Sequence, residues 1–177
     1  MDIKSELIEK AKKIKILLLD VDGVLTDGRI VYDSRGCNIK FFDVHDGLGV
    51  YCLKKTGIKT MLITAKGSRA IRPRARDMGV SAVFENISPK TAVLEKILKK
   101  YRVNTEEICF VADDLVDLCL MKRVGLPIAV FNAAPEIKEV ASYITLKPGG
   151  GGAVREVAEL ILKAQGKWEG VIRGYDV

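Results

Sequence analysis

The stretch LLLDVDGVLTDG, residues 17–28, decides the fold because an apolar run ends abruptly at two aspartates separated by one residue. The run begins at Ile14 or Lys15 and continues to Val21, as is typical of a strand covered on both faces. Similar runs occupy residues 59–64, 108–113 and 126–131. Helical patterns lie between and after them, at residues 46–55, 68–78, 88–101, 115–124 and 153–165. This alternation predicts an α/β fold, a doubly wound Rossmann-like parallel sheet with helices on both faces.

One segment, GRIVYDSRGCNIKFFDV at residues 28–44, breaks the alternation. Its two short alternating runs flank DSRG, and Gly36 can adopt the positive φ that a tight turn needs, so we expect a β-hairpin. No repeat or linker divides the rest, so we expect one domain over residues 1–177. The glycine run at residues 149–152 predicts a local turn or hinge. Residues 166–177 have no periodicity and are expected to form a C-terminal tail.

Composition narrows the class of protein. Lys and Arg number 29 against 23 Asp and Glu, a net charge of +6, but the basic residues are dispersed and aromatics are only 6%. Solvated helix faces explain this surplus better than a nucleic-acid site, and a small anionic substrate is compatible with it. The charged N-terminus is not a secretory signal and no run is long enough to cross a bilayer, so we expect a cytoplasmic location. Four cysteines without a CxxC pair predict reduced, buried thiols, and a single histidine makes zinc improbable.

Charged and polar residues gather where the predicted strands end. The carboxyl ends of parallel strands meet at one edge, where ligands bind in this fold class. Carboxylates crowded there would repel one another, and a bound divalent cation, with Mg²⁺ favoured by oxygen ligands, would relieve that repulsion. Residues i and i+2 project to the same side of a strand, so the first aspartate could attack an electrophile while the second handles a proton. The residues are Asp20, Asp22, Thr64, Asp113, Asp114 and Asp117, with Lys90 at the start of a helix.

Four segments in this order, DVDGVLTDG, LIT, the lysine of SPKTAVLEK, and ADDLVD, resemble the motifs of the haloacid dehalogenase superfamily of phosphotransferases. Over nearly its whole length the chain also resembles the 3-deoxy-D-manno-octulosonate 8-phosphate phosphatase family, through FDVHDGLG, ITAKGSRAIRPRARDMG, VADDLVDLCLMKRVGLPIAV and KPGGGGAVREV. The resemblance implies Asp20 as nucleophile, Asp22 as general acid and then base, and Thr64 and Lys90 as catalytic partners. It implies Mg²⁺ held by the Asp20 carboxylate, the Asp22 backbone carbonyl and Asp113, supported indirectly by Asp114 and Asp117.

The resemblance also implies how substrate is bound. Besides Asp22 and Lys90, the family's substrate contacts fall on Asp43, Val44, His45, Asp46, Gly47, Tyr51, Lys66 and Arg74. Family members usually carry Arg where this chain has His45 and Lys66, and commonly a basic residue where it has Tyr51. The family lacks a cap domain, and here only the hairpin could stand in its place. The resemblance therefore implies a homotetramer whose hairpins meet and whose sites are capped by neighbouring subunits. The glycine-rich stretch and the tail resemble a mobile segment that can close over a neighbouring site.

The resulting expectation is a Mg²⁺-dependent phosphatase that hydrolyses 3-deoxy-D-manno-octulosonate 8-phosphate through an aspartyl-phosphate, in lipopolysaccharide precursor synthesis. Another phosphate ester such as a nonulosonate 9-phosphate is an alternative substrate, motivated by His45, Tyr51 and Lys66. A receiver-type phosphoacceptor domain is an alternative of a different class. It shares clustered Asp, Thr and Lys with Mg²⁺, but places its acidic pair before the acceptor strand and lacks a DxDG. A catalytically silent assembly module would need a damaged DxD or a missing Lys90, and both are intact.

Overall fold

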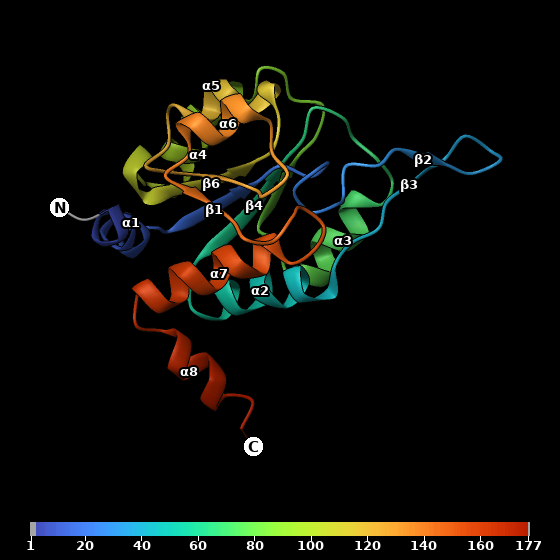
Figure 1. Cartoon of the computed structure of the whole chain (residues 1–177). Coiled ribbons are helices and arrows are strands. Elements are labelled where there is room, and N and C mark those ends of the chain that lie inside the picture. Colours follow the sequence, from blue (N-terminus) through green and yellow to red (C-terminus); the bar gives the residue numbers. More distant parts are fainter. Residues whose placement is uncertain (1–2, 177) are drawn as a thin grey trace.

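The computed structural model describes residues 3–176, so the ends of the predicted 1–177 domain and of the 166–177 tail lie outside the described residues. Its centre is a six-stranded parallel sheet in the order β5-β4-β1-β6-β7-β8 (Figure 1). The predicted α/β fold is confirmed. The strands are β1 (Ile16–Leu19), β4 (Lys59–Ile63), β5 (Ala82–Phe84), β6 (Ile108–Ala112), β7 (Leu126–Ala129) and β8 (Tyr143–Ile144).

Strand β1 lies inside the sheet, and all four of its residues are buried. It pairs with β4 on one side and β6 on the other, so that Leu18 lies opposite both Met61 and Phe110. The strand order therefore reverses at β1, and ligands bind at such a switch point in doubly wound sheets. The four predicted strands are confirmed but end sooner than their apolar patterns. The short strands β5 and β8 were not predicted, because two or three residues carry too little pattern.

Helices cover both faces of the sheet, with α2, α3 and α7 on one side and α4, α5 and α6 on the other (Figure 1). Two predicted helices, at residues 88–101 and 115–124, begin as 3₁₀ turns. Helix α3 begins later than predicted, so Pro73 lies in its first turn, where the N–H that proline lacks would have no helical hydrogen-bond partner. The helices are α1 (Ile3–Lys12), α2 (Val44–Lys55), α3 (Ile71–Met78), α4 (Leu94–Tyr101), α5 (Leu118–Met121), α6 (Pro135–Val140), α7 (Ala153–Ala164) and α8 (Trp168–Arg173), with 3₁₀ turns η1 (Lys90–Val93), η2 (Thr105–Glu107) and η3 (Leu115–Asp117).

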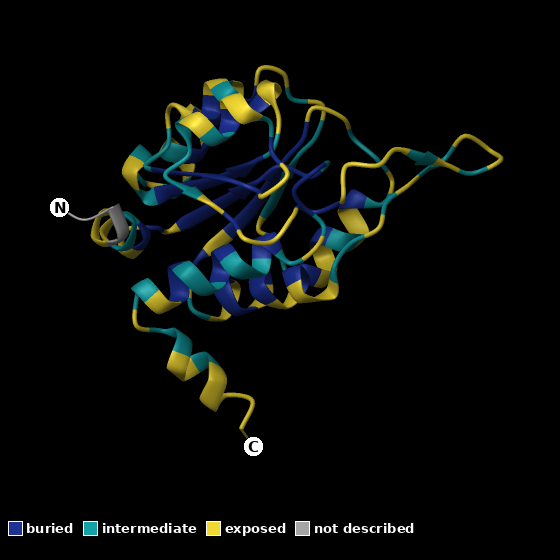
Figure 2. Cartoon of the chain, in the orientation of Figure 1, coloured by how far each residue is buried: buried dark blue, intermediate teal, exposed yellow. Residues whose placement is uncertain are grey.

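Burial follows this layering. The sheet is buried between its helices, whereas the hairpin and α8 are largely exposed or half-buried (Figure 2). Within residues 3–176, no helix combines the length and apolarity needed to span a membrane. The four cysteines are unpaired, and Cys52 and Cys109 are buried as expected. Cys119 is exposed, which corrects the expectation for that thiol, because it lies on the face of α5 opposite the buried core.

The predicted hairpin is confirmed as the antiparallel pair β2 (Val31–Tyr32) and β3 (Asn38–Ile39). Its turn has Gly36 at φ +74°, where the amide of that residue donates to the carbonyl of Asp33. The paired part is only two residues long on each strand, and the hairpin projects away from the sheet (Figure 1). Two-stranded ribbons are marginal on their own, so contacts at the hairpin base must fix its direction.

The C-terminal segment contains a helix that the lack of periodicity did not predict. Helix α8 forms there. Two cationic side chains of α7 lie over the Trp168 ring, with Arg155 Cζ 5.3 Å and Lys163 Nζ 5.5 Å from the ring centre. The glycine run before α7 is packed and not a free hinge. The Gly150 amide donates to the Val24 carbonyl at 2.9 Å. A Cβ on Gly149 would lie 1.7 Å from the backbone oxygen of Gly23, in the loop that follows β1, so only glycine permits this approach.

Candidate active site

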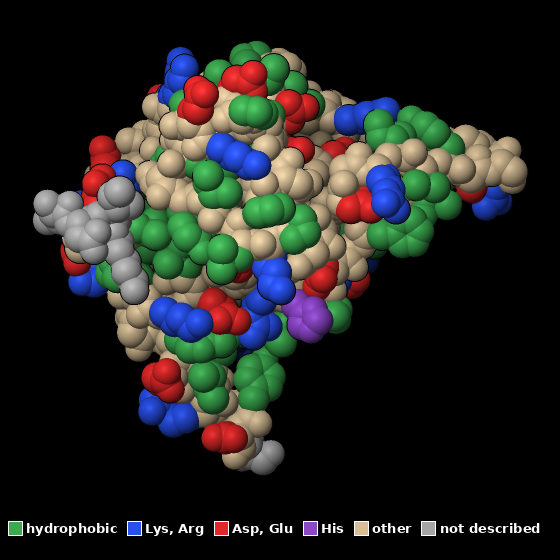
Figure 3. Space-filling view, viewed as in Figure 1, with side chains coloured by type: hydrophobic (Ala, Val, Ile, Leu, Met, Phe, Trp, Pro, Cys, Tyr) green, Lys and Arg blue, Asp and Glu red, His purple; other side chains and the backbone are tan. Residues whose placement is uncertain are grey.

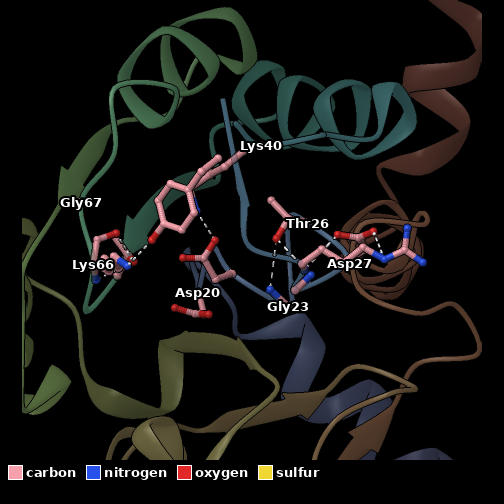
Figure 4. A network of polar contacts seen from close by, with 12 residues as sticks. Asp20, Gly23, Thr26, Asp27, Lys40, Lys66 and Gly67 are labelled. Atoms are coloured by element: carbon pink, nitrogen blue, oxygen red, sulfur yellow. Dashed lines mark hydrogen bonds and ion pairs between the residues drawn. The ribbon is translucent and has the colours of Figure 1, made fainter. Parts of the chain in front are cut away.

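The loop after β1 turns back sharply and fixes Asp20 at the edge of the sheet. The Asp20 amide donates to the Val111 carbonyl of β6 at 3.1 Å, and the residue is only 5% exposed. The buried Thr26 hydroxyl accepts hydrogen bonds from the amides of Gly23 at 3.2 Å and Gly28 at 3.3 Å. Figure 4 shows this loop beside Asp20, with Lys40 and Lys66 approaching the same region. The threonine and the final glycine of the motif, Thr26 and Gly28, thus close the loop.

Three carboxylates meet at this edge. Asp20 follows β1, Asp113 follows β6 and Asp117 ends η3, and each offers an oxygen within 4.8 Å of the others. Gly23 permits this grouping, because a Cβ at its position would lie 1.9 Å from Asp113 Oδ2. Asp117, which was expected to support the metal indirectly, has its side chain fully buried within this cluster. The predicted meeting of Asp20 and Asp113 is observed.

Lys90 brings one positive charge into the acidic cluster. Its side chain is 2% exposed, and its ammonium forms ion pairs with Asp20 and Asp117. The Phe110 ring lies 5.9 Å from Nζ. Burial alone would lower the pKa of Lys90, but the two carboxylates raise it above its ordinary value. The lysine therefore remains charged and offsets part of the negative charge of the cluster.

The carboxylates exceed the charge that one lysine can balance. Burial, with repulsion from Asp20 next, raises the pKa of Asp113 and of Asp117 to about 7. Burial also raises the pKa of Asp20, although Lys90 opposes it. A divalent cation would hold these groups ionised, since oxygen-only ligands at short mutual distance suit Mg²⁺. The carboxylates of Asp20 and Asp113, with Asp117 beside them, therefore fit the predicted magnesium ion.

Asp22 has a different partner. Its side chain is 36% exposed and forms an ion pair with Lys40, at the base of the hairpin. The expectation that Asp20 and Asp22 project together rested on strand geometry, but β1 ends at Leu19 and Gly23 takes φ +91°. The alternation rule does not extend into that turn. Asp22 thus lies outside the three-carboxylate group found among the described residues.

Thr64 follows β4 at the same edge and is 2% exposed. Its hydroxyl donates to the Lys66 carbonyl at 3.0 Å and accepts from the Lys66 amide at 3.1 Å. The Lys66 ammonium lies 3.3 Å from the Tyr32 hydroxyl of the hairpin and 6.0 Å from its ring centre. Thr64 therefore shapes the loop that presents Lys66 to the hairpin.

Asp114 is exposed and accepts a hydrogen bond from the Leu115 amide at 2.7 Å. It thereby caps the 3₁₀ turn that carries Asp117. Among residues 3–176 its carboxylate is not part of the three-carboxylate group. Its structural contribution is to position that turn.

Several predicted substrate contacts gather at the start of α2. Asp43 caps the helix, since its carboxylate accepts from the His45 amide at 2.6 Å and lies 3.1 Å from the His45 ring Nδ1. Val44 is 73% exposed. Arg74 of α3 donates to the Asp43 carbonyl at 2.7 Å, and a Cβ on Gly47 would lie 2.5 Å from its guanidinium. The structure thus brings these five residues together.

Two predicted contacts are used elsewhere. The Asp46 side chain is fully buried and accepts from the Arg155 amide at 2.8 Å, at the start of α7. Burial raises the pKa of Asp46 to about 6. It joins two helices, which corrects the expectation that its carboxylate contacts a substrate. Tyr51 lines a groove of about 710 Å³ between α2 and α8, which no residue of the acidic cluster lines, so a single chain does not bring Tyr51 to the cluster.

Lys40 and Tyr32 were missed by the sequence reasoning. Both lie in the hairpin, where polar residues in an alternating run are expected to face solvent. A weak signal was present for Lys40, because residues 40 and 42 share a face of an extended strand and Phe42 packs against the core.

Comparisons with known proteins identify close relatives. A haloacid dehalogenase-like hydrolase family model matches residues 80–157. The 3-deoxy-D-manno-octulosonate 8-phosphate phosphatase KdsC of Escherichia coli (strain K12) is 38% identical over 165 residues, which are 93% of this chain and 88% of that protein.

Solved structures give the same picture. A 3-deoxy-D-manno-octulosonate 8-phosphate phosphatase from Moraxella catarrhalis, in complex with magnesium, phosphate and KDO, has a TM-score of 0.94 and 40% identity, covering 97% of this chain and 98% of that one. A cobalt-bound deoxy-D-mannose-octulosonate 8-phosphate phosphatase from Haemophilus influenzae has a TM-score of 0.85 and 36% identity, covering 89% and 92%. The acidic edge of the sheet thus occurs in a chain that closely resembles metal-bound phosphatases.

Proposed function

The chain belongs to the 3-deoxy-D-manno-octulosonate 8-phosphate phosphatase family of haloacid dehalogenase-like hydrolases, and on this premise we propose that it hydrolyses 3-deoxy-D-manno-octulosonate 8-phosphate. The products are the free sugar acid and inorganic phosphate, so the protein is a phosphoric monoester hydrolase. The observation that carries the proposal is the group of Asp20, Asp113 and Asp117, two of which, Asp20 and Asp117, pair with the buried Lys90. Family membership rules out the receiver alternative. A place in lipopolysaccharide precursor synthesis stays a prediction.

Mg²⁺ is the cofactor of this site. The Asp20 and Asp113 carboxylates and the Asp22 backbone carbonyl would hold it, and Asp117 and Asp114 would orient those ligands. When bound, the ion neutralises the crowded carboxylates and polarises the oxygens of the phosphoryl group. The raised pKa values of Asp113 and Asp117 support this assignment, because carboxylates that resist ionisation on their own are suited to a cation.

The protein groups divide the chemistry between them. An Asp20 oxygen forms a bond to phosphorus while the ester P–O bond breaks, and the electron pair of that bond leaves with the sugar oxygen. Asp22 gives a proton to the departing oxygen and later takes one from the water that cleaves the aspartyl-phosphate. Lys90 orients the Asp20 carboxylate, and Lys90 and Thr64 stabilise charge on the transferred group. Its contact with both Asp20 and Asp117 supports this role for Lys90.

The start of α2 is the proposed site for the sugar acid. Exposed His45, with Asp43 beside it, and the nearby Arg74 offer polar groups there. Lys66, from the loop after β4, lies beside Tyr32 of the hairpin and would add a positive charge. His45 and Lys66 cannot form the bidentate carboxylate contact of an arginine. That observation keeps a nonulosonate 9-phosphate as the alternative substrate.

A homotetramer is the proposed assembly. Exposed apolar side chains gather along the hairpin (Figure 3). The exposed fractions are 63% for Ile30, 54% for Tyr32, 40% for Ile39 and 67% for Phe41. Apolar exposure of this kind on a projecting ribbon marks a protein contact surface. A neighbouring subunit at the hairpin would cover the open side of the site.

The test is a phosphate-release assay with Mg²⁺ across sugar phosphates, including both sugar-acid esters. We expect 3-deoxy-D-manno-octulosonate 8-phosphate to give the highest kcat/KM and Asp20→Asn to abolish turnover. Asp27→Asn is the matched control, since Asp27 lies in the same loop but is 45% exposed and paired with Arg29. Turnover that survives in Asp20→Asn would refute the mechanism, and equal kcat/KM for every ester would refute the substrate assignment.

A further inference from the structure

Lys40 is an unusual residue for an exposed hairpin. Its side chain is only 6% exposed, whereas the adjacent Ile39 and Phe41 are 40% and 67% exposed. A buried ammonium is costly unless it is paired, and the partner that the structure gives it is the Asp22 carboxylate. The burial of Lys40 is therefore compensated at one of the two aspartates of the DxD motif.

The two aspartates of the motif are held by two different lysines. Lys90, from η1, binds Asp20 together with Asp117, deep in the cluster. Lys40, from the hairpin base, binds Asp22, which is 36% exposed. The Asp22 carboxylate is thus kept away from the three clustered carboxylates and at the open side of the site. A leaving group that departs from the phosphoryl group toward solvent would meet Asp22 on that side.

We infer that Lys40 is a positioning residue that holds the Asp22 carboxylate where it can exchange a proton with the sugar oxygen. The inference rests on the proposed function of Asp22. In this step Lys40 keeps its own proton and donates a hydrogen bond, while the proton of Asp22 moves to the sugar oxygen as the P–O bond breaks. The hairpin base is then part of the active site of its own chain.

The connection from the hairpin to α2 strengthens the argument. Lys40 is followed after two residues by Asp43, whose carbonyl accepts from Arg74 at 2.7 Å. The Arg74 guanidinium also lies 5.7 Å from the Phe42 ring. The segment that carries Lys40 is therefore fixed at the body of the protein even though the hairpin projects from it, as positioning requires.

The experiment compares Lys40→Met and Lys40→Arg on two esters with Mg²⁺. The first is the sugar-acid phosphate, whose alkoxide leaving group needs a proton. The second is p-nitrophenyl phosphate, whose leaving group is stable as an anion. We expect Lys40→Met to lower kcat/KM for the sugar ester about 100-fold, a typical contribution of a positioned proton donor, and to change kcat/KM for the aryl ester less than about threefold. The ratio kcat/KM reports the steps up to departure of the leaving group, so the later attack of water, in which Asp22 acts as base for both esters, does not enter it. Lys40→Arg should recover at least about tenfold of the lost kcat/KM.

Arg35→Met is the matched control, since it also removes a cation from the hairpin but lies at its exposed tip. It should leave both reactions unchanged. Equal losses of kcat/KM for both esters in Lys40→Met, or no loss for either, would overturn the inference. If Lys40→Met does not fold, Lys40→Gln provides the same comparison with a neutral donor. A wild-type protein without activity on the sugar ester would instead refute the proposed function, so the two failures are distinguishable.

Discussion

Replacing Gly23 with alanine should remove the magnesium site without removing the fold. An added Cβ would lie 1.9 Å from Asp113 Oδ2, and contacts below 3.0 Å are essentially never observed, so that oxygen must move by about 1.1 Å. Metal sites tolerate errors of only about 0.2 Å in ligand distance. We therefore expect Gly23→Ala to weaken Mg²⁺ binding at least about 100-fold, or about 2.7 kcal/mol.

Gly28→Ala separates this effect from backbone strain. Gly28 has φ +81° against +91° for Gly23, so alanine at either position costs about 1–2 kcal/mol of stability. The Cβ of residue 28 would be 3.6 Å from its nearest neighbour, an ordinary contact. Calorimetric titration with Mg²⁺ should give a wild-type affinity for Gly28→Ala within about threefold.

Thermal unfolding provides the second measurement. Mg²⁺ should raise the Tm of the wild type and of Gly28→Ala, because a ligand that binds only the native state stabilises it, but should barely change that of Gly23→Ala. Equal loss of affinity in the two variants would show that loop strain, not the position of Asp113, controls the site. Wild-type affinity in Gly23→Ala would refute the steric reasoning altogether.

Three further predictions follow from the buried charges. Lys90→Met should lower the free energy of unfolding in EDTA by about 3–5 kcal/mol, measured with urea, because buried carboxylates lose their cation, and a variant as stable as the wild type would contradict this. Asp46→Asn keeps an acceptor for the Arg155 amide. Burial raises the pKa of Asp46 from 3.8 to about 6, so the wild type loses stability as the pH rises through that range. Between pH 4 and pH 7, the free energy of unfolding of Asp46→Asn, measured with urea, should rise relative to that of the wild type by up to about 3 kcal/mol. A difference between the two proteins that does not change with pH would refute the assignment. Because the pKa of Asp113 is about 7 without metal, protons should compete with Mg²⁺, so calorimetry should show weaker binding at pH 6 than at pH 8. Equal affinity at both pH values would contradict that competition.

The apolar strand patterns were enough to predict most of the fold and the meeting of two carboxylates of the site. Because four long apolar runs specify parallel strands, and such strands align their carboxyl ends, the meeting of Asp20 and Asp113 could be predicted. The short strands β5 and β8 could not, because their stability comes from pairing with β4 and β7 and not from their own residues. Helix α8 was missed for the same reason, since it is held by contacts between Trp168 and α7.

Side chains whose partners lie far away in the sequence were the least predictable. Asp22 follows a turn at which the alternation of the strand has ended, so its direction depends on Lys40, a residue 18 positions away. Asp46 has the sequence context of a substrate contact, but the start of α7, more than 100 residues later, uses its carboxylate. No local pattern distinguishes these outcomes, because each depends on a partner brought close only by packing.

The sequence by itself determined the parallel sheet, the hairpin and the chemical types at the catalytic edge, since hydrophobic period and motif order are local properties of the chain. Tertiary structure alone decided which charges meet: Lys90 with Asp20 and Asp117, and Lys40 with Asp22. The physical reason is that a buried charge must find its partner wherever the fold supplies one, and that choice is made by the packing of distant segments.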